Sequence, residues 1–358
     1  MEYYIILFIL YFLIGLIEIN NKKKTEYSKI FALISLFPLF VLTAFRDVRV
    51  GNDTIAYVHT YNILSYISNF KDIFLYSRME PGYIFINYIF AITGAEYICM
   101  QIFISGFIYY SLFRFLSRYS VNIGLSCIIF LGMRMFCGPM NVVRMWIALA
   151  ILLFALDYFI QSKIYKANIL IILAMTFHYS ALIFLALNFT NSKLNTRNVI
   201  IIILTSVAIA LAGKSFFDVA TGSVGLYQGY LDSKYFNYDD NIAIYLTLLI
   251  DITLTGLYFF LFKIEKINYS KTLIIFVYLS IFSVGLDIIG LTNTIMTRIS
   301  GYFYISWMIL IPIAVNYIKK ANIKLLIYCC LAIGFLAQFL VVMIFRPTWN
   351  GVVPYVWY

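Results

Sequence analysis

Long apolar runs follow one another along the whole chain, and they constrain its fold more than any other feature. A membrane-spanning helix needs about 20 apolar residues. The other structures that cross a bilayer are closed barrels, whose strands read as alternating segments of about ten residues. The runs here are continuous, so the sequence predicts an all-α, polytopic integral membrane protein. We expect about ten spans, at roughly 3–19, 28–45, 97–113, 121–137, 143–160, 199–212, 242–262, 272–291, 299–318 and 323–345.

The composition supports the same class. Hydrophobic residues make up 63% of the chain and charged residues only 12%, whereas soluble proteins carry about 25% charged residues. The core of a soluble protein of this chain length could not bury so much apolar surface. These values exclude a soluble enzyme, a nucleic-acid binder and a secreted disulfide-rich domain. We expect one transmembrane domain over residues 1–358.

The charges of the short loops predict the topology, because cytoplasmic loops are enriched in Lys and Arg. Two apolar stretches, 83–93 and 167–189, are ambiguous. The basic loops share one side only if the first does not cross and the second returns to the side it left. We therefore predict an interfacial or re-entrant helix after Glu80 and a helical hairpin with His178 near its outer tip. The basic loops are 20–24, 114–118, 163–166, 193–197, 263–271 and 319–324.

This topology places both termini and three substantial segments on the outer face, at 46–81, 213–241 and 346–358. A bacterial inner membrane is the natural setting, with the functional face toward the periplasm or the outside. Seven of the ten arginines lie on this outer side, against the positive-inside trend. They are Arg46, Arg49, Arg78, Arg134, Arg144, Arg298 and Arg346.

The guanidinium group binds phosphate oxygens through a fixed fork of donors. We expect Arg46, Arg49, Arg144 and Arg298 to bind a pyrophosphate-bearing substrate at the outer leaflet. The alternative for any single arginine is a structural ion pair with a nearby carboxylate, or extension of the side chain to the interface. Tyr57, Asn141 and Tyr302 are weaker candidates for substrate contacts. No metal site and no cofactor are expected.

Three outer residues could act on a hydroxyl proton. Asp53 lies in the polar loop after the second span, where its alternative role is to cap the next helix. Glu80 precedes a Pro-Gly turn at the membrane boundary, where partial burial would raise its pKa toward that of a general base. The alternative for Glu80 is a favourable position at a helix start. His178, at the hairpin break, titrates near neutrality without tuning, and its alternative is a satisfied core histidine.

Two acids, Asp251 and Asp287, lie within predicted spans. An ionisable residue inside a membrane is a functional candidate by default. The sequence offers no partner for either.

Several motifs together resemble the EpsG/Wzy group of bacterial polysaccharide polymerases. They are Phe45-Arg46, Val50-Gly-Asn-Asp-Thr54 with Tyr57, Glu80-Pro-Gly-Tyr83 with Asn87, Arg144 with Ile147-Ala148, His178-Tyr-Ser-Ala181, Arg298 with Tyr302, and Trp349-Asn350 with Pro354-Tyr355.

The resemblance implies glycosyl transfer between oligosaccharide repeat units carried on undecaprenyl pyrophosphate, at the outer face of the inner membrane. It also implies a GT-C-like plan, contact with membrane lipid and a possible chain-length regulator protein. Such a reaction needs no cofactor, because the donor is already activated.

Three other functions remain open. An O-antigen ligase uses the same donor but would have a larger outer loop than 213–241. A glycolipid flippase would show inverted repeats and matched discontinuous helices, which the sequence lacks. A membrane O-acyltransferase would use His178, but its acyl donor would enter from the cytoplasm.

Overall fold

The computed structural model describes residues 1–20, 24–67, 69, 71–75, 79–190, 193–224 and 242–358. All named elements in these ranges are helices, and the one β-bridge among them joins Arg46 to Trp357. The prediction of an all-α, polytopic membrane protein is confirmed. Contacts divide the chain into two compact units, one formed by Met1–Asn188 with Lys320–Tyr358, and the other by Phe189–Lys319.

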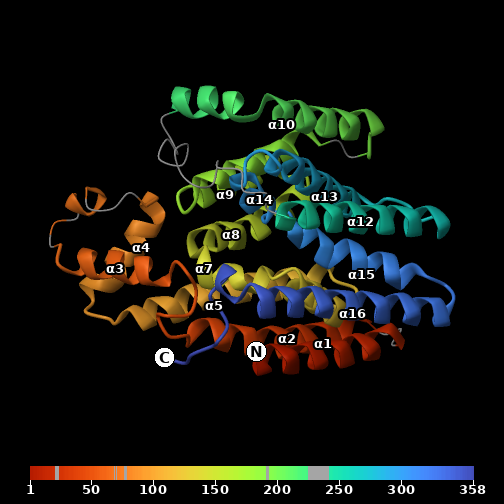
Figure 1. Ribbon diagram of the computed structural model, residues 1–358, viewed down its shortest axis with the longest axis horizontal. Coiled ribbons are helices and arrows are strands. Elements are labelled where there is room, and N and C mark those ends of the chain that lie inside the picture. Colours follow the sequence, from red (N-terminus) through yellow and green to blue (C-terminus); the bar gives the residue numbers. More distant parts are fainter. Residues whose placement is uncertain (21–23, 68, 70, 76–78, 191–192, 225–241) are drawn as a thin grey trace. The chain divides into compact units, whose positions relative to one another are not determined.

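The helices of the first unit come from both ends of the chain (Figure 1). Long helices alternate there with short ones. They are α1 (Glu2–Asn20), α2 (Lys24–Ala44), α3 (Thr54–Ser65), η1 (Asp72–Phe74), α4 (Pro81–Ile92), α5 (Tyr97–Tyr119), α6 (Ile123–Gly132), η2 (Met135–Cys137), α7 (Gly138–Asn141), α8 (Val143–Ile160), α9 (Ile164–Met175), η3 (Tyr179–Phe189), α16 (Ala321–Phe345) and η5 (Pro347–Trp349).

The second unit is built around α13, which is buried along most of its length. Helices α10 and α12 both pack on α13 (Figure 1). The elements are α10 (Thr196–Val224), α12 (Ile242–Ile264), α13 (Lys271–Gly290), α14 (Ile295–Ser300), η4 (Tyr304–Ser306) and α15 (Trp307–Tyr317). The outer segment predicted from residue 213 begins inside α10, and its residues 225–241 lie outside the described residues.

Eight helical segments in the described ranges are long and apolar enough to cross a membrane. In this count α14, η4 and α15 together form one segment, Ile295–Tyr317. A ninth span results if α6 and the η2–α7 segment, bent by 68° at their junction, count as one. The bend follows from Arg134, which adopts a left-handed conformation at φ 59° between the two segments. These nine correspond to nine of the ten predicted spans. The tenth, 199–212, lies in α10, whose apolar part Thr196–Ala212 is shorter than the others.

The two ambiguous stretches form short elements. Helix α4 has 12 residues, too few to cross a hydrocarbon layer about 30 Å thick at 1.5 Å per residue. In the second stretch, α9 ends at Met175 and η3 begins at Tyr179. The Asn188 side chain donates to Asn168 Oδ1 over 3.1 Å. This bond joins the end of η3 to the early part of α9, so the chain returns along itself with His178 at the turn.

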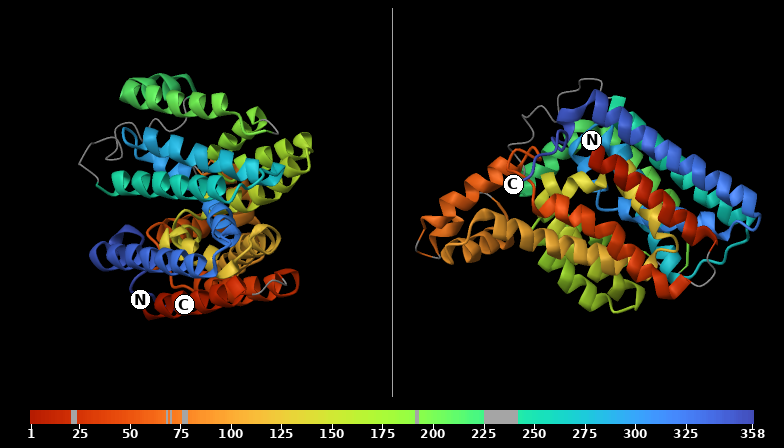
Figure 2. Two further views of the ribbon diagram at one scale, coloured as in Figure 1. Left: turned by 90° about the vertical axis from the view of Figure 1, so that its right-hand side faces the viewer. Right: turned by 90° about the horizontal axis from the view of Figure 1, so that it is seen from below.

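The C-terminal tail packs against the loop that follows α2. Asp47 N donates to the Val356 carbonyl over 3.0 Å, and Trp357 Nε1 donates to the Tyr3 hydroxyl over 3.1 Å. The two ends of the chain therefore lie near one another, as both views in Figure 2 show. This packing gives the irregular loop backbone hydrogen-bond partners.

Candidate active site

A carboxylate, an imidazole and a guanidinium meet in the first unit. Glu80 Oε1 lies 2.8 Å from His178 Nδ1, and Glu80 Oε2 accepts a hydrogen bond from Arg144 Nη1. The three residues come from the start of α4, the turn between α9 and η3, and the first turn of α8. The structure thus brings together three of the residues that the sequence predicted as catalytic or phosphate-binding.

The Pro-Gly pair after Glu80 explains how α4 reaches this position. Pro81 occupies the first helical turn, where a missing N–H is tolerated. Gly82 N donates to the Thr176 carbonyl over 2.8 Å. A Cβ on Gly82 would lie 2.6 Å from Thr176 Oγ1 and 2.9 Å from the Thr176 carbonyl oxygen. Only glycine allows this close approach, which docks the start of α4 two residues from His178.

Arg144 is held from two sides. Its guanidinium pairs with Glu80 and interacts with the Tyr57 hydroxyl. Arg144 Nε is buried and has no hydrogen-bond acceptor among the residues that the structure describes. The side chain remains 24% exposed. The group is therefore anchored, yet it keeps donors that its protein partners do not use.

Glu80 is buried, with 3% of its surface exposed. Burial opposes its ionisation, but the hydrogen bond from His178 and the charge of Arg144 outweigh burial and hold its pKa below the ordinary value. Our expectation that its pKa would be raised was wrong. The error has a physical cause, because a carboxylate with two charge-stabilising partners stays ionised even when it is buried.

An ionised Glu80 determines the role of each imidazole nitrogen. A carboxylate only accepts hydrogen bonds, so the proton of the 2.8 Å contact lies on His178 Nδ1. Neutral His178 then carries its lone pair on Nε2. The His178 side chain is 22% exposed, whereas Glu80 is enclosed. The cluster is therefore reached through His178 and Arg144.

Tyr57 lines the same cluster from α3. It is buried, and its ring centroid lies 5.4 Å from that of Tyr83. Burial raises the pKa of Tyr57, Arg144 opposes this, and the Asp53 carboxylate adds to the rise. Asp53 thus lies close enough to act on Tyr57 electrostatically. Its side chain occupies the N-cap position of α3 without forming a capping hydrogen bond.

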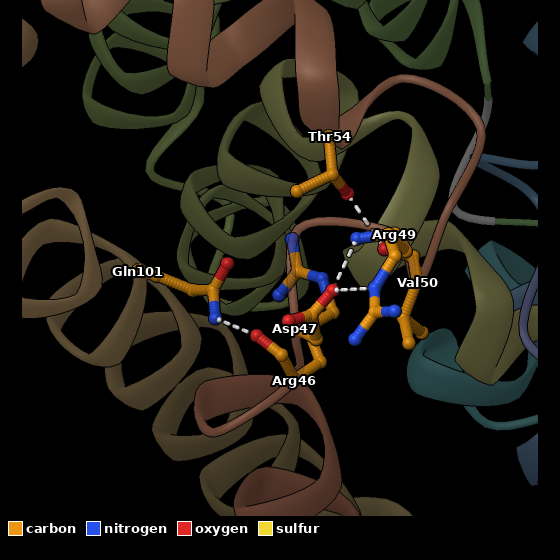
Figure 3. A network of polar contacts seen from close by, with 6 residues as sticks. All are labelled: Arg46, Asp47, Arg49, Val50, Thr54 and Gln101. Carbon is orange, nitrogen blue, oxygen red and sulfur yellow. Dashed lines mark hydrogen bonds and ion pairs between the residues drawn. The ribbon is translucent and has the colours of Figure 1, made fainter. Parts of the chain in front are cut away.

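Arg46, which we expected to bind pyrophosphate, is turned into the protein. It is 2% exposed, and its Nη1 donates to the Thr43 carbonyl over 2.5 Å. Gln101 donates to the Arg46 carbonyl over 3.0 Å (Figure 3). Burial lowers the pKa of this guanidinium. In this arrangement Arg46 is inaccessible to a ligand, which corrects the expectation.

Arg49 points the other way. Its side chain is 69% exposed, and Nε donates to Asp47 Oδ1 over 2.7 Å (Figure 3). The backbone N–H of Arg49 donates to the same oxygen over 2.9 Å. Arg49 is accessible, and it carries the structural ion pair that we weighed as the alternative.

The Gly-Asn-Asp-Thr motif is bound to two other segments. Gly51, at φ 90°, packs against the Met140 carbonyl, and a Cβ there would lie 2.2 Å from that oxygen. Asn52 N donates to Asn141 Oδ1 over 2.7 Å, and the Asn141 amide donates to the Asn350 carbonyl over 2.9 Å. Asn141 therefore joins the loop to the tail, a role that differs from the substrate contact we expected.

The remaining predicted residues belong to the second unit. Arg298 lies on α14 and is exposed. Tyr302 is fully buried, so its side chain is inaccessible to a ligand in this arrangement.

Sequence reasoning missed the ion pairs of two inner arginines. Arg114 and Arg118 were interpreted only as topology signals, but both pair with the buried Asp157 carboxylate, Arg118 at 3.3 Å. The available signal was Asp157 itself, an acid near the end of an apolar helix beside a basic loop.

Comparison with known proteins agrees with the resemblance carried by the motifs. The family model of the EpsG family matches residues 29–357. No curated protein and no solved structure matches the chain. The family is associated with glycosyltransferase-like polymerases and suggests a polysaccharide polymerase-like role. Since the match covers nearly the whole chain, the protein belongs to the EpsG family.

Proposed function

We propose that this protein is a membrane glycosyltransferase that polymerises lipid-linked oligosaccharide repeat units. The observation that carries the proposal is the contact of His178 and Arg144 with one ionised carboxylate, Glu80. It combines a base for a hydroxyl proton with a cation for a phosphate leaving group. Family membership supports the same reaction class.

The proposed transfer breaks the bond between the anomeric carbon of the growing glycan and its pyrophosphate oxygen. The new bond forms between that carbon and a hydroxyl oxygen of the incoming unit. His178 Nε2 accepts the hydroxyl proton and later releases it to water. The lipid pyrophosphate leaves as an anion, and its developing charge is stabilised by the Arg144 guanidinium.

In this proposal Glu80 is a positioning residue. It accepts the hydrogen bond from His178 Nδ1, which orients the ring and stabilises the imidazolium that forms during transfer. It also holds Arg144, with help from Tyr57. Asp53 acts on this group through Tyr57 in our proposal. Of the three candidates for the base, Glu80, His178 and Asp53, we now propose His178.

Arg49 and Arg298 remain proposed pyrophosphate ligands, on the basis of their exposure. The proposed donor carrier is undecaprenyl pyrophosphate, presented at the periplasmic or outer face of a bacterial inner membrane. The proposed partners are membrane lipid and a chain-length regulator. The apolar helices support a membrane-embedded setting.

Two experiments test the function. Deletion of the gene should leave single repeat units where the parent strain makes polymer, whereas loss of a ligase would leave no units on the acceptor. Lipid-linked units extracted from the deletion strain should be polymerised by the purified protein in detergent, without other proteins. A flippase or a ligase would give no polymer in that assay.

A further inference from the structure

Two buried carboxyl groups meet in the second unit, and neither is among the residues proposed for the transfer. Asp251 lies on α12 and Asp287 on α13, in helices long and apolar enough to span a membrane. Both are fully buried. Ser283, whose hydroxyl donates to the Asp251 carboxyl, lies one helical turn before Asp287 on α13, so the two carboxyls are neighbours. Two ionised carboxylates have only acceptors to offer, so a hydrogen bond between these neighbours needs a proton on one of them.

Three hydroxyl groups donate hydrogen bonds to these two carboxyls. Ser283 Oγ donates to Asp251 Oδ2 over 2.7 Å, and Ser300 Oγ donates to Asp287 Oδ1 over 2.5 Å. The Tyr304 hydroxyl lies 3.3 Å from both Asp287 oxygens. These donors come from α13, α14 and η4, so the pair connects several elements of the unit.

One oxygen of the pair is left without a donor. Asp251 Oδ1 is buried and accepts no hydrogen bond from the side chains that the structure describes. The indole of Trp307 interacts with Asp251, but its buried Nε1 likewise has no hydrogen-bond acceptor in the described ranges. The three hydroxyl donors therefore leave Asp251 Oδ1 without a hydrogen bond. A proton shared by the two carboxyls would supply one further donor to the pair.

Charge leads to the same conclusion. None of the described lysine, arginine or histidine side chains forms an ion pair with either aspartate. Two adjacent negative charges in apolar surroundings repel one another and are poorly solvated. Two carboxyls that share one proton carry a single negative charge, which the surrounding hydroxyls can stabilise.

We propose that Asp251 and Asp287 form an intramembrane proton-binding site, in which the two carboxyls share one proton and join α12 to α13. The groups that face the site are Ser283 from α13, Ser300 from α14, the titratable Tyr304 from η4 and Trp307 from α15. Arg298, on α14, is exposed. From α10, Ser206 approaches α13 at Gly285 and brings no charge.

The proposal makes the local packing depend on pH in one direction. The folded protein binds a proton that two solvated aspartates would release near neutrality. Stability contributed by the site is therefore complete at low pH and is lost as pH rises through the value at which the proton leaves. A single Asp→Asn substitution replaces the carboxylic acid with an amide that can donate the same hydrogen bond.

Infrared spectroscopy of the full-length protein in lipid nanodiscs tests for the proton directly. At neutral pH the wild type should show the carbonyl band of a protonated carboxyl that shifts in D₂O. Asp251→Asn and Asp287→Asn should each lose this band, because the remaining carboxyl ionises. Glu2→Gln, which changes an exposed acid on α1, should retain the band. A spectrum with no such band at neutral pH would overturn the proposal.

The melting temperature Tm, measured at a series of pH values, gives a second test that does not depend on assigning an infrared band. The wild-type Tm should fall as pH rises above neutrality, and either single Asn variant should show a smaller fall. An equal fall in the wild type and both variants would contradict a shared proton. The site is independent of glycosyl transfer, so failure of the polymerisation assay leaves these outcomes unaffected.

Discussion

His178 Nδ1 lies 2.8 Å from Glu80 Oε1, across 98 positions of sequence. The same carboxylate pairs through its other oxygen with Arg144. One acidic side chain therefore orients both the base and the cation of the proposed reaction.

His178→Asn should abolish most polymerisation while donor binding persists. Asparagine can hydrogen-bond to Glu80 but cannot accept a proton at neutral pH, so we expect a loss of about 100- to 10,000-fold in kcat. The measurement is polymer formation from purified lipid-linked units, with donor binding measured alongside. His59→Asn is the matched control, because His59 lies exposed on α3. Equal activity of the two variants would remove His178 from the mechanism.

Glu80→Gln should lower activity and also stability, because it leaves Arg144 without its carboxylate. Loss of a buried charge-assisted hydrogen bond costs about 2 kcal/mol. The activity–pH profile should change, since the imidazolium of His178 loses its stabilising charge. Glu2→Gln, which changes an exposed acid on α1, is the control variant. An unchanged pH profile in Glu80→Gln would show that Glu80 does not act on His178.

The lowered pKa of Glu80 predicts a pH dependence of stability. A carboxyl whose pKa is lower in the folded state stabilises the fold above its unfolded pKa of about 4.3. That stabilisation is lost as pH falls through the folded pKa. The wild-type Tm in detergent should therefore drop on acidification below about pH 4.3, and Glu80→Gln should drop less. Parallel curves for the two proteins would contradict the stabilised carboxylate.

Arg144→Lys should impair polymerisation strongly, whereas Arg49→Lys should be milder. Lysine keeps the charge but loses the planar fork that contacts Glu80, Tyr57 and a phosphate together. Arg49 is largely exposed and pairs with Asp47, so a lysine there can keep a similar contact. The readout is initial rate over a range of donor concentrations. Full activity of Arg144→Lys at normal expression would exclude a bidentate role.

The helices were largely predictable from sequence, and the site was predictable only in part. Apolar runs of helix length identify spans because each segment satisfies its own backbone hydrogen bonds in lipid. Glu80, His178 and Arg144 could be identified as candidate site residues from sequence, because a charged or polar residue beside an apolar run is conspicuous. Their meeting was not predictable, because it depends on contacts across 64 and 98 positions.

Two errors show what local sequence cannot reveal. The pKa of Glu80 was expected to rise because only its burial could be inferred, while its two partners could not. Arg46 was expected to face a ligand, but the side-chain direction is decided by the packing of the tail and of α5 against the loop. The Asp251–Asp287 contact is a third case, since each acid lies in a different span.

Topology is tested by cysteine labelling from outside the cell, in a background where the exposed Cys99 and Cys330 are replaced by serine. Thr60→Cys and Val356→Cys should react with a membrane-impermeant maleimide. Tyr165→Cys, Asn195→Cys and Asn322→Cys should react only after permeabilisation. The reason is the chain reversal at His178, which returns η3 to the side where α9 began. Labelling of position 195 in intact cells would contradict the hairpin.

Gly82→Ala should uncouple Glu80 from His178 without changing any charged residue. The added Cβ would lie 2.6 Å from Thr176 Oγ1 and 2.9 Å from the Thr176 carbonyl oxygen, so α4 must move away from the end of α9. We expect a loss of activity comparable to that of Glu80→Gln, with the same change in pH profile. Gly106→Ala on α5 is the matched control, because its nearest neighbour is a Phe40 carbon at 3.8 Å. If Gly82→Ala retains wild-type turnover and an unchanged pH profile, the close approach of α4 to Thr176 does not position the proposed catalytic residues.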